Sequence, residues 1–407
     1  MTSALIVLTV LSSPASVPSA SGSIGPIVTE AAFLEAVGPE DPRWVSLEEG
    51  VAEAEAEVRR AAVLPNPVVA FGREAPEGLP AENTWLLTWR PPLDGRRGPT
   101  REAAAAGLRA ARADLAADRL SVRAELRRVY AAWALAAARV ALVVSHVGRL
   151  ERTAEVLRRR AATGEISGLA ARRIGLSAEM GRTALARAEA TRERALASVR
   201  GLWPGVPEGA RPELPGLRAP QPGRGSSERP DLVALEERVG QAELRAKSAG
   251  RFWSFPELAF GWQTLRGDLV NVDGPVFAVS WSVPLFDRDQ GRRAEAEGRA
   301  RVLAARRTIA RRRAKAEVEG ARAAYLGLSA ATLRAAELAR STEVVVRGTR
   351  AAFEAGEATL TDLNDALRVA FAAELDALEL KGEALSAGRA LEVAVGRPLD
   401  AGAGGVR

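Results

Sequence analysis

The chain has 407 residues, and its hydrophobic content of 47% comes largely from alanine, with aromatic residues making up only 5%. Such a composition favours long helices packed side by side over a large globular core. The net charge of +6 would suit nucleic acid or another anionic surface, but arginines alternate with glutamates as on solvated helix faces, so we expect no nucleic-acid partner.

Cysteine is absent and histidine occurs once. Disulfides and thiolate metal sites are therefore excluded, and a lone histidine does not complete a protein-only transition-metal site of the usual kind. We expect no enzyme, no catalytic residue, no bound metal and no cofactor. His146 lies in a helical apolar run, where a structural role is the favoured interpretation.

Residues 1–20 resemble a secretory signal peptide. Residues 4–11 form an apolar core, and the small residues Ser19, Ala20 and Ser21 suit cleavage near position 20. No Lys or Arg precedes Arg43, so the usual positive segment is missing. No later run of about 18 uncharged apolar residues occurs, so we expect an exported protein without a transmembrane helix.

A first structural repeat is predicted over residues 21–203, with strands near 66–73 and 83–91 and long helices over 101–163 and 166–203. Apolar residues recur by threes, fours and sevens from Leu108 to Leu150, which is typical of a coiled-coil seam. At 1.5 Å per residue, the first helix would be about 95 Å long. Residues 204–228, rich in Pro, Gly and Ser, are expected to form a linker.

A second repeat is predicted over residues 229–398, with strands near 255–264 and 275–285, long helices over 291–355 and 359–397, and a flexible tail over 399–407. The separations Trp89 to Trp281 and Gly164 to Gly356 are both 192 residues (281 − 89 and 356 − 164). A period this long indicates a duplicated subdomain, because solenoid repeats span about 20 to 50 residues.

Bulky apolar side chains alternate with small or polar ones along the predicted strands. This pattern is typical of a transmembrane barrel and also of a half-buried soluble sheet. Four strands cannot close on themselves, and the chain has no other segment to cover an apolar sheet face, which favours the barrel. The positions expected to face lipid are Trp85, Leu87, Trp89, Leu258, Phe260, Trp262, Phe277, Val279 and Trp281.

In their order and spacing, several motifs resemble those of the TolC-type outer-membrane efflux proteins, over nearly the whole chain from about Phe33 to Pro398. Residues 229–235 look like the motif that opens the family's second repeat. Residues 41–44 look like a degraded form of the motif that opens its first repeat. Residues 284–293 resemble the strand-to-helix junction, and residues 353–362 resemble the tip of the inner helix pair. Residues 91–97 look most like the CzcC-like heavy-metal branch.

The resemblance implies a mainly α fold with a small β part. Long coiled-coil helices of the duplicated repeat would form a trimeric periplasmic α-barrel, and four strands per protomer would contribute to a 12-stranded transmembrane β-barrel. The implied function is a passive outer-membrane exit duct of a tripartite efflux pump, with metal cations among the candidate cargoes. The implied partners are two further copies, a periplasmic adaptor, an inner-membrane transporter of RND or ABC type, and outer-membrane lipid.

The same resemblance places Asp362 and Asp365 at the periplasmic constriction, where a trimer would have two rings of three carboxylates. The alternative is helix capping, because Thr359 precedes Asp362 by three residues. The first repeat has Ala170 where the family often has aspartate, and Phe353 stands where a tyrosine is common, so a weakly latched closed state is expected.

The two predicted helix turns carry Gly164 with Glu165 and Gly356 with Glu357, and the resemblance implies that they contact the adaptor. Glycine there would supply the left-handed backbone that a tight reversal needs. The alternative function, from another class, is a soluble periplasmic coiled-coil scaffold or adaptor with an ordinary sheet.

Overall fold

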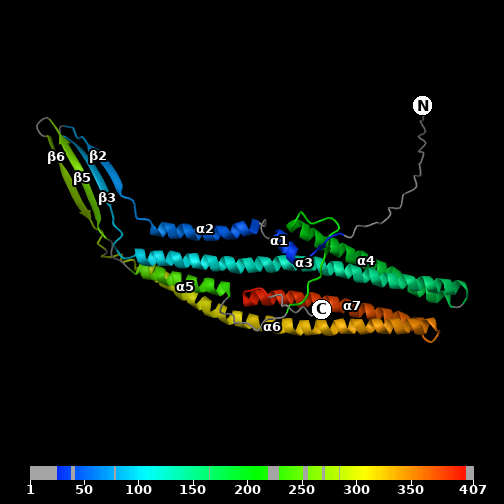
Figure 1. Cartoon of the computed structure of the whole chain (residues 1–407). Helices are drawn as coiled ribbons and strands as arrows, with labels where there is room; N and C mark the ends of the chain where they lie inside the picture. Colours follow the sequence, from blue (N-terminus) through cyan, green and yellow to red (C-terminus); the bar gives the residue numbers. More distant parts are fainter. Residues whose placement is uncertain are drawn as a thin grey trace, which may run out of the picture.

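The computed structural model describes residues 25–37, 42–77, 79–164, 166–218, 229–250, 255–267, 271–283 and 285–399. The expected signal peptide, Glu165 and all but the first residue of the expected tail lie outside these ranges. The chain is an elongated rod with a sheet at one end and helix turns at the other (Figure 1). Long helices connect the two ends.

The first half contains four helices: α1 (Glu30–Val37), α2 (Pro42–Ala62), α3 (Arg97–Ala162) and α4 (Gly168–Leu202). The 66 residues of α3 span about 100 Å at 1.5 Å per residue. Ser167 caps α4 by accepting a hydrogen bond from the backbone N–H of Leu169. Sequence periodicity did not reveal α1 and α2, which precede the first strand.

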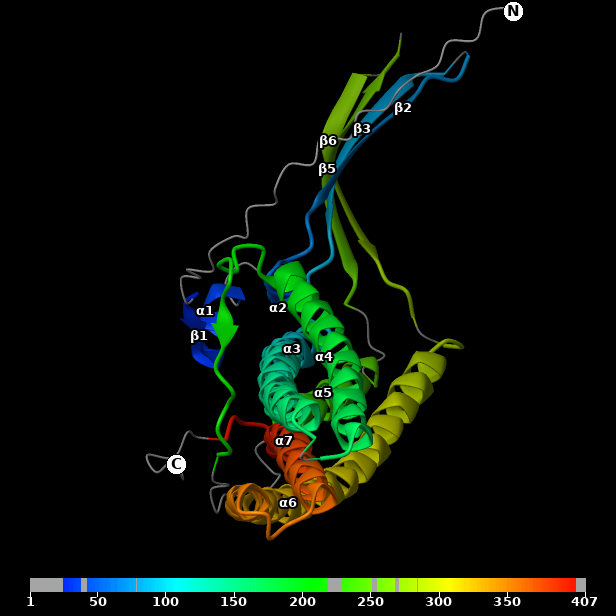
Figure 2. The same cartoon turned by 90° about the vertical axis from the view of Figure 1, so that its right-hand side faces the viewer.

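The second half contains α5 (Pro230–Ala249), α6 (Gln290–Glu354) and α7 (Leu360–Val395). Near the sheet, α2 packs on α3, α3 on α5, and α5 on α6; farther away, α4 packs on α3, α3 on α7, and α7 on α6. The helices therefore form a curved layer, as Figure 2 shows. One edge is α2 near the sheet and α4 farther away, and the other edge is α6.

Four antiparallel strands form the sheet: β2 (Val68–Glu74), β3 (Ala81–Trp89), β5 (Glu257–Arg266) and β6 (Asn271–Ser280). Their order is β2-β3-β5-β6, so the central pair joins the two repeats. Within the described residues, β2 and β6 each lack a second neighbour. The sheet is thus open at both edges.

The middle of the rod holds an aromatic core. Phe33 of α1, Tyr130 and Trp133 of α3, and Val199 of α4 are fully or almost fully buried there. Two short parallel strands, β1 (Ile27–Val28) and β4 (Arg211–Pro212), close over this core. Residues 204–218 of the expected linker thus carry ordered structure that packs on the helices.

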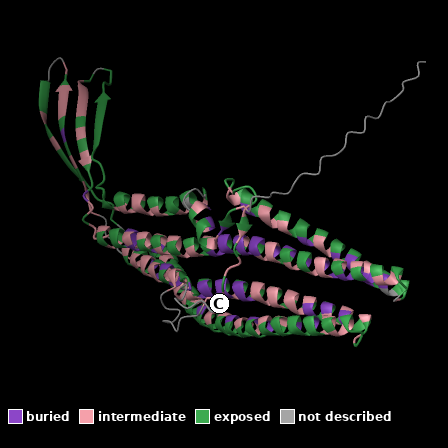
Figure 3. Cartoon of the chain, turned by 45° about the vertical axis from the view of Figure 1, so that its right-hand side comes forward, coloured by how far each residue is buried: buried purple, intermediate pink, exposed green. Residues whose placement is uncertain are grey.

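Buried residues concentrate along α3 and α7, whereas most of the sheet is exposed or half-buried (Figure 3). Among the described helices, α3 contains an 18-residue window that is long and apolar enough to cross a membrane by length and composition. Tyr130, Trp133 and Val143 of this helix are buried against other elements. Helix packing therefore buries part of this apolar stretch.

Candidate functional site

One face of the sheet carries the bulky apolar side chains that the alternation predicted. Residues directly opposite in antiparallel strands share a face, and the pairing forms three cross-strand rows. These rows are Phe71, Trp85, Trp262 and Pro275; Val69, Leu87, Phe260 and Phe277; and Trp89, Leu258 and Val279. Trp281 follows β6 directly and continues its alternation. Sequence analysis missed Val69 and Phe71, which extend the same face onto β2.

No other part of the described chain covers these apolar side chains. Their exposed fractions run from 38% at Trp89 to 72% at Phe277. Aromatic rings contact one another along the rows, with centroids 4.6 Å apart for Phe71 and Trp85 and 4.9 Å apart for Phe260 and Phe277. Such a large bare apolar face marks a surface that meets lipid or another protein.

Among the described residues, the opposite face of the sheet carries no aromatic ring, and its polar and charged side chains alternate with apolar residues such as Leu86 and Val276. Gln263 donates a hydrogen bond to Glu82 at 2.6 Å, and Arg90 pairs with Glu257 at 3.3 Å. Gly261 lies between these two polar pairs, and a Cβ at this position would collide with the carbonyl oxygen of Trp85. The two faces therefore differ in polarity as a wall between lipid and water requires.

Asp362 and Asp365 lie on the exposed face of the first turns of α7. Asp362 forms a capping box with Thr359, because its carboxylate accepts from the backbone N–H of Thr359 at 2.9 Å while the Thr359 hydroxyl accepts from the Asp362 N–H at 3.2 Å. The hydrogen bonds from Thr359 lower the pKa of the Asp362 carboxyl. The capping alternative is thus observed, and the capped carboxylate keeps its charge.

The rest of this end of the helical layer holds the carboxylate pair in place. Asp365 lies 3.4 Å from Arg368, one turn farther along α7. On the other side of the helix, Leu363 and Leu367 are buried in a cluster that includes Leu150. Phe353 contacts this cluster, with the Arg160 guanidinium 5.7 Å from the centre of its ring. Because the buried leucines hold the opposite side of α7 against its neighbours, both carboxylates point away from the packed helices and are exposed.

The two helix turns lie together at the end of the rod opposite the sheet (Figure 1). Gly164 and Gly356 have positive φ values of 78° and 79°, as the glycine positions predicted. The N–H of Glu357 donates to the Ala352 carbonyl at 2.8 Å, which closes the end of α6. Both repeats thus reverse direction with the same backbone geometry at positions 192 residues apart (356 − 164).

His146 of α3 stacks on Phe371 of α7, with ring centroids 4.0 Å apart. Burial and the nearby Arg149 lower the pKa of its imidazole, and its Nδ1 is buried without a hydrogen-bond partner among the described residues. Within those same ranges, no group of three or more His, Cys, Asp or Glu residues could hold a metal ion. The surroundings of His146 are those of a packing residue.

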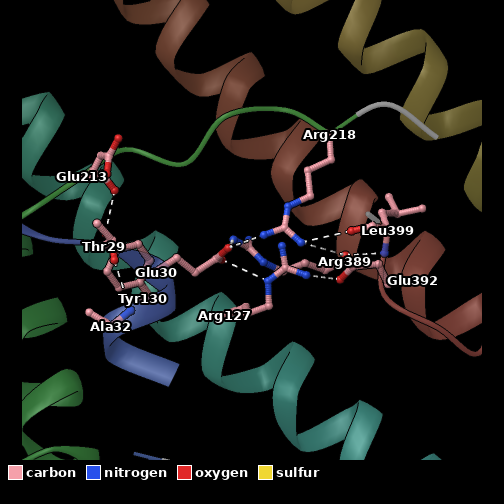
Figure 4. Close-up of polar contacts among 10 residues, drawn as sticks. All are labelled: Thr29, Glu30, Ala32, Arg127, Tyr130, Glu213, Arg218, Arg389, Glu392 and Leu399. Atoms are coloured by element: carbon pink, nitrogen blue, oxygen red, sulfur yellow. Dashed lines mark hydrogen bonds and ion pairs between the residues drawn. The ribbon is translucent and has the colours of Figure 1, made fainter. Parts of the chain in front are cut away.

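A buried ionic cluster in the middle of the rod was not predicted (Figure 4). Arg127 of α3 lies 3.1 Å from Glu30 of α1 and pairs with Glu392 of α7. Arg389 lies 3.3 Å from Glu30, and Arg218 lies 3.3 Å from Glu30 and 3.8 Å from Glu392. The cluster joins both repeats, the N-terminal segment and the connection between repeats.

Some local signals point to this cluster. Arg127 lies directly after the buried Leu126 and three residues before Tyr130, so it occupies the apolar stripe of α3. Arg389 and Glu392 interrupt the corresponding stripe of α7 in the same way. Charged residues at seam positions indicate a buried ion pair, but the sequence does not identify the partners.

The comparisons with known proteins agree with this geometry. Residues 224–397 match the family model described as outer membrane efflux protein. The chain is 26% identical over 390 residues to the cobalt-zinc-cadmium resistance protein CzcC of Cupriavidus metallidurans, covering 92% of this chain and 91% of that protein.

Two solved structures show the same fold. CusC superposes with a TM-score of 0.75 at 16% identity, covering 90% of this chain and 92% of that one. The outer membrane protein VceC of Vibrio cholerae superposes with a TM-score of 0.71 at 16% identity, covering 91% and 97%. The expected fold class, a duplicated long-helix repeat with four strands, is therefore confirmed.

Proposed function

We propose that this chain, whose residues 224–397 match the outer membrane efflux protein family, forms with two further copies the passive exit duct of a tripartite pump. It is an efflux channel of the outer membrane that reaches into the periplasm. Proteins of this family work with a periplasmic adaptor and an inner-membrane transporter, and the family is a duct and not an enzyme. The bare apolar face of the sheet is the observation that carries the proposal.

The open edges of the sheet support assembly. Strands β2 and β6 end the sheet on its two sides, and both are antiparallel to their inner neighbours. Exposed strand edges need partners, and closing a sheet into a barrel removes them. Three chains of four strands each would close a 12-stranded barrel (3 × 4) in which β6 of one copy pairs with β2 of the next.

The edges of the helical layer are suited to the same closure. The outer side of α6 presents Gly298, Ala305 and Ile309 at spacings of seven and four, and Ile309 is 51% exposed. A Cβ at Gly298 would meet nothing within 4 Å. Small and apolar residues at this spacing form a stripe on which a neighbouring helix packs closely.

The other edge of the layer carries a comparable stripe. Leu169, Leu176 and Met180 of α4 are 75%, 67% and 74% exposed and are spaced by seven and four residues. In the trimer, the α6 stripe near the sheet would therefore lie against the next copy's α2, and the α4 stripe near the helix turns would lie against the far part of a neighbouring copy's α6. The alternative scaffold function would leave both stripes and the sheet face uncovered, so the geometry favours the trimeric duct.

Within this duct, Asp362 and Asp365 would form two rings of three carboxylates at the periplasmic constriction. Both side chains are exposed, and the cap holds Asp362 in one orientation. A ring of fixed carboxylates favours cations in a narrow, low-dielectric pore. The capping role and the ring role are compatible, because capping consumes hydrogen-bonding capacity and leaves the negative charge.

The turns at Gly164, Glu165, Gly356 and Glu357 would contact the adaptor, since they end the rod on the side away from the sheet. The transporter would be of RND or ABC type. Metal cations are the proposed cargo, supported by the likeness to a cobalt-zinc-cadmium resistance protein. The absence of metal-ligand clusters from the described residues suits a duct that passes ions without holding them.

Planar-bilayer recordings of the purified protein test the duct and its selectivity. Asp362→Asn together with Asp365→Asn removes six charges per trimer (2 × 3), while an amide oxygen at position 362 can still accept from Thr359. We expect lower cation selectivity and weaker block by multivalent cations. Glu357→Gln, at the turn, is the control that should leave selectivity unchanged. Identical selectivity in the double variant and the parent would reduce the two aspartates to helix caps.

The adaptor contact has its own test. Because the chain contains no cysteine, Glu357→Cys introduces a unique thiol. We expect this thiol to form a cross-link with an adaptor in cells that express the pump, whereas a cysteine at Leu79, near the far end of the sheet, should not.

A further inference from the structure

A groove lined by arginines lies between α5 and α6, in the part of the helical layer near the sheet. Its volume is 660 Å³, within the range of small-molecule sites. Five arginines, Glu295 and Gln241 line it together with apolar residues. The lining arginines are Arg238 and Arg245 of α5 and Arg292, Arg299 and Arg306 of α6.

The arginines form two rows because of their spacing. On each helix they recur every seven residues, which is close to two full turns and keeps them on one side. The apolar residues between the rows are all buried or half-buried. They are Ala242, Ala249, Ala296 and Leu303. The groove therefore has a cationic rim and an apolar floor.

Three of the five arginines already have acidic partners. Arg245 lies 3.1 Å from Glu57, Arg238 pairs with Asp114, and the Nε of Arg292 donates to Asp289 at 2.9 Å. Arg299 and Arg306 differ. Both are exposed, and neither makes a hydrogen bond or ion pair with any residue that the structure describes. The neighbouring Arg307 and Arg311 each form an ion pair with Glu236 at 2.7 Å.

We propose that this groove binds an amphipathic organic anion. A carboxylate, sulfonate or phosphate group would pair with Arg299 and Arg306, whose planar guanidinium groups suit such oxygens. The apolar body would lie on the alanine and leucine floor. The charge of the rim excludes a bare metal cation as the ligand. The site is complete within one chain, so it goes beyond the duct function and does not depend on the cargo.

Equilibrium titration with the fluorescent probe 8-anilinonaphthalene-1-sulfonate tests the site. The full chain is reconstituted in nanodiscs of zwitterionic phospholipid, and the signal of empty nanodiscs is subtracted. We expect saturable binding that Arg299→Gln with Arg306→Gln weakens by about tenfold or more, since charge-assisted hydrogen bonds are lost. The matched control is Arg334→Gln with Arg347→Gln, two exposed arginines of the same helix outside the groove.

Two further arms define the ligand. N-phenyl-1-naphthylamine, which has the same rings without the sulfonate, should bind the parent protein no better than the double variant. Inorganic phosphate should displace the sulfonate probe only at high concentration, because it lacks the apolar body. Bilayer conductance of each variant, measured separately, shows whether the duct itself is intact.

Several outcomes would overturn the proposal. Equal probe affinity in the parent and the Arg299/Arg306 variant excludes an arginine-bound head group. An equal loss in the Arg334/Arg347 control shows a general charge effect. Absence of saturable binding to a conducting trimer shows that the groove does not bind such an anion in the assembled protein.

Discussion

The guanidinium of Arg96 lies 2.7 Å from the carboxylate of Asp289, so the strand-to-helix junctions of the two repeats are tied directly to each other. With a period of 192 residues, Asp289 occupies the place that Arg97 has in the first repeat (289 − 192 = 97). Asp289 has a φ of 60°, the only positive value among the described residues other than glycine. One aspartate thus combines a left-handed turn with a link between repeats.

Replacing Asp289 should separate its two roles. Asp289→Asn loses the charge but tolerates the left-handed backbone, whereas Asp289→Ala loses both. We expect the alanine variant to unfold more easily than the asparagine variant by about 1 kcal/mol, as measured by urea titration of the far-UV circular dichroism. Equal stability of the two variants would show that the backbone conformation at this turn is not strained.

The buried ionic cluster should be far more sensitive than a surface ion pair. Arg127→Met leaves Glu392 and Glu30 in a buried site with one arginine fewer, and breaking one side of a buried pair costs about 3–5 kcal/mol. The control Arg119→Met breaks an exposed pair with Glu48, which should cost less than about 1 kcal/mol. Urea titrations compare the two variants.

A double variant tests whether the cluster is needed for stability as such. Arg127→Met combined with Glu392→Met removes the buried pair from both sides, and such replacements are often neutral. We expect the double variant to be more stable than Arg127→Met alone. If Arg127→Met alone cost no more stability than the Arg119→Met control, the cluster would not be desolvated in the assembled protein.

The cap at Thr359 can be separated from the charge of Asp362. Thr359→Ala should destabilise the start of α7 by about 1 kcal/mol, whereas Thr359→Ser should preserve the cap. Hydrogen exchange of the first amides of α7 should be faster in the alanine variant only. Ion selectivity should be unchanged in both, because the carboxylates remain. A selectivity change in Thr359→Ala would show that the orientation of Asp362 matters as much as its charge.

The two sheet faces should respond oppositely to arginine. Leu258→Arg places a charge on the apolar face, at a cost of about 2–4 kcal/mol near the bilayer midplane, and should impair membrane insertion. Gln263→Arg lies on the polar face next to Glu82 and should assemble normally. Trimer recovery from outer-membrane fractions measures both. Equal recovery would mean that the apolar face does not meet lipid.

His146 should make the stability of the helical layer depend on pH. Its folded-state pKa is lowered by burial and Arg149, so the stabilising contribution is present above the unfolded pKa of about 6.5 and is lost as pH falls through the folded pKa. His146→Leu cannot titrate. Melting temperatures at about pH 7.5 and about pH 5.5 should therefore differ more for the parent than for this variant. Equal pH dependence would assign the effect to other groups.

Local patterns in the sequence predicted the two-faced strands and the helix turns of this protein. The alternation of Leu87 with Thr88, and of Phe260 with Gly261, defines two faces of a strand because successive side chains point in opposite directions. Glycine at positions 164 and 356 predicted the left-handed turns. Each of these signals acts between residues that are close in the chain, so a single sequence contains it.

Only the tertiary structure showed which distant residues meet. Arg127 and Glu392 are 265 positions apart, and their pairing depends on how α3 of one repeat packs against α7 of the other. The two arginine rows of the groove likewise face each other only because α5 lies beside α6. The sequence alone determined the duplicated repeat, the two-faced strands and the turns, because local periodicity specifies them. The fold decided the ionic cluster and the groove, because long-range packing brings together charged residues from different helices, and the sequence does not show which helices lie side by side.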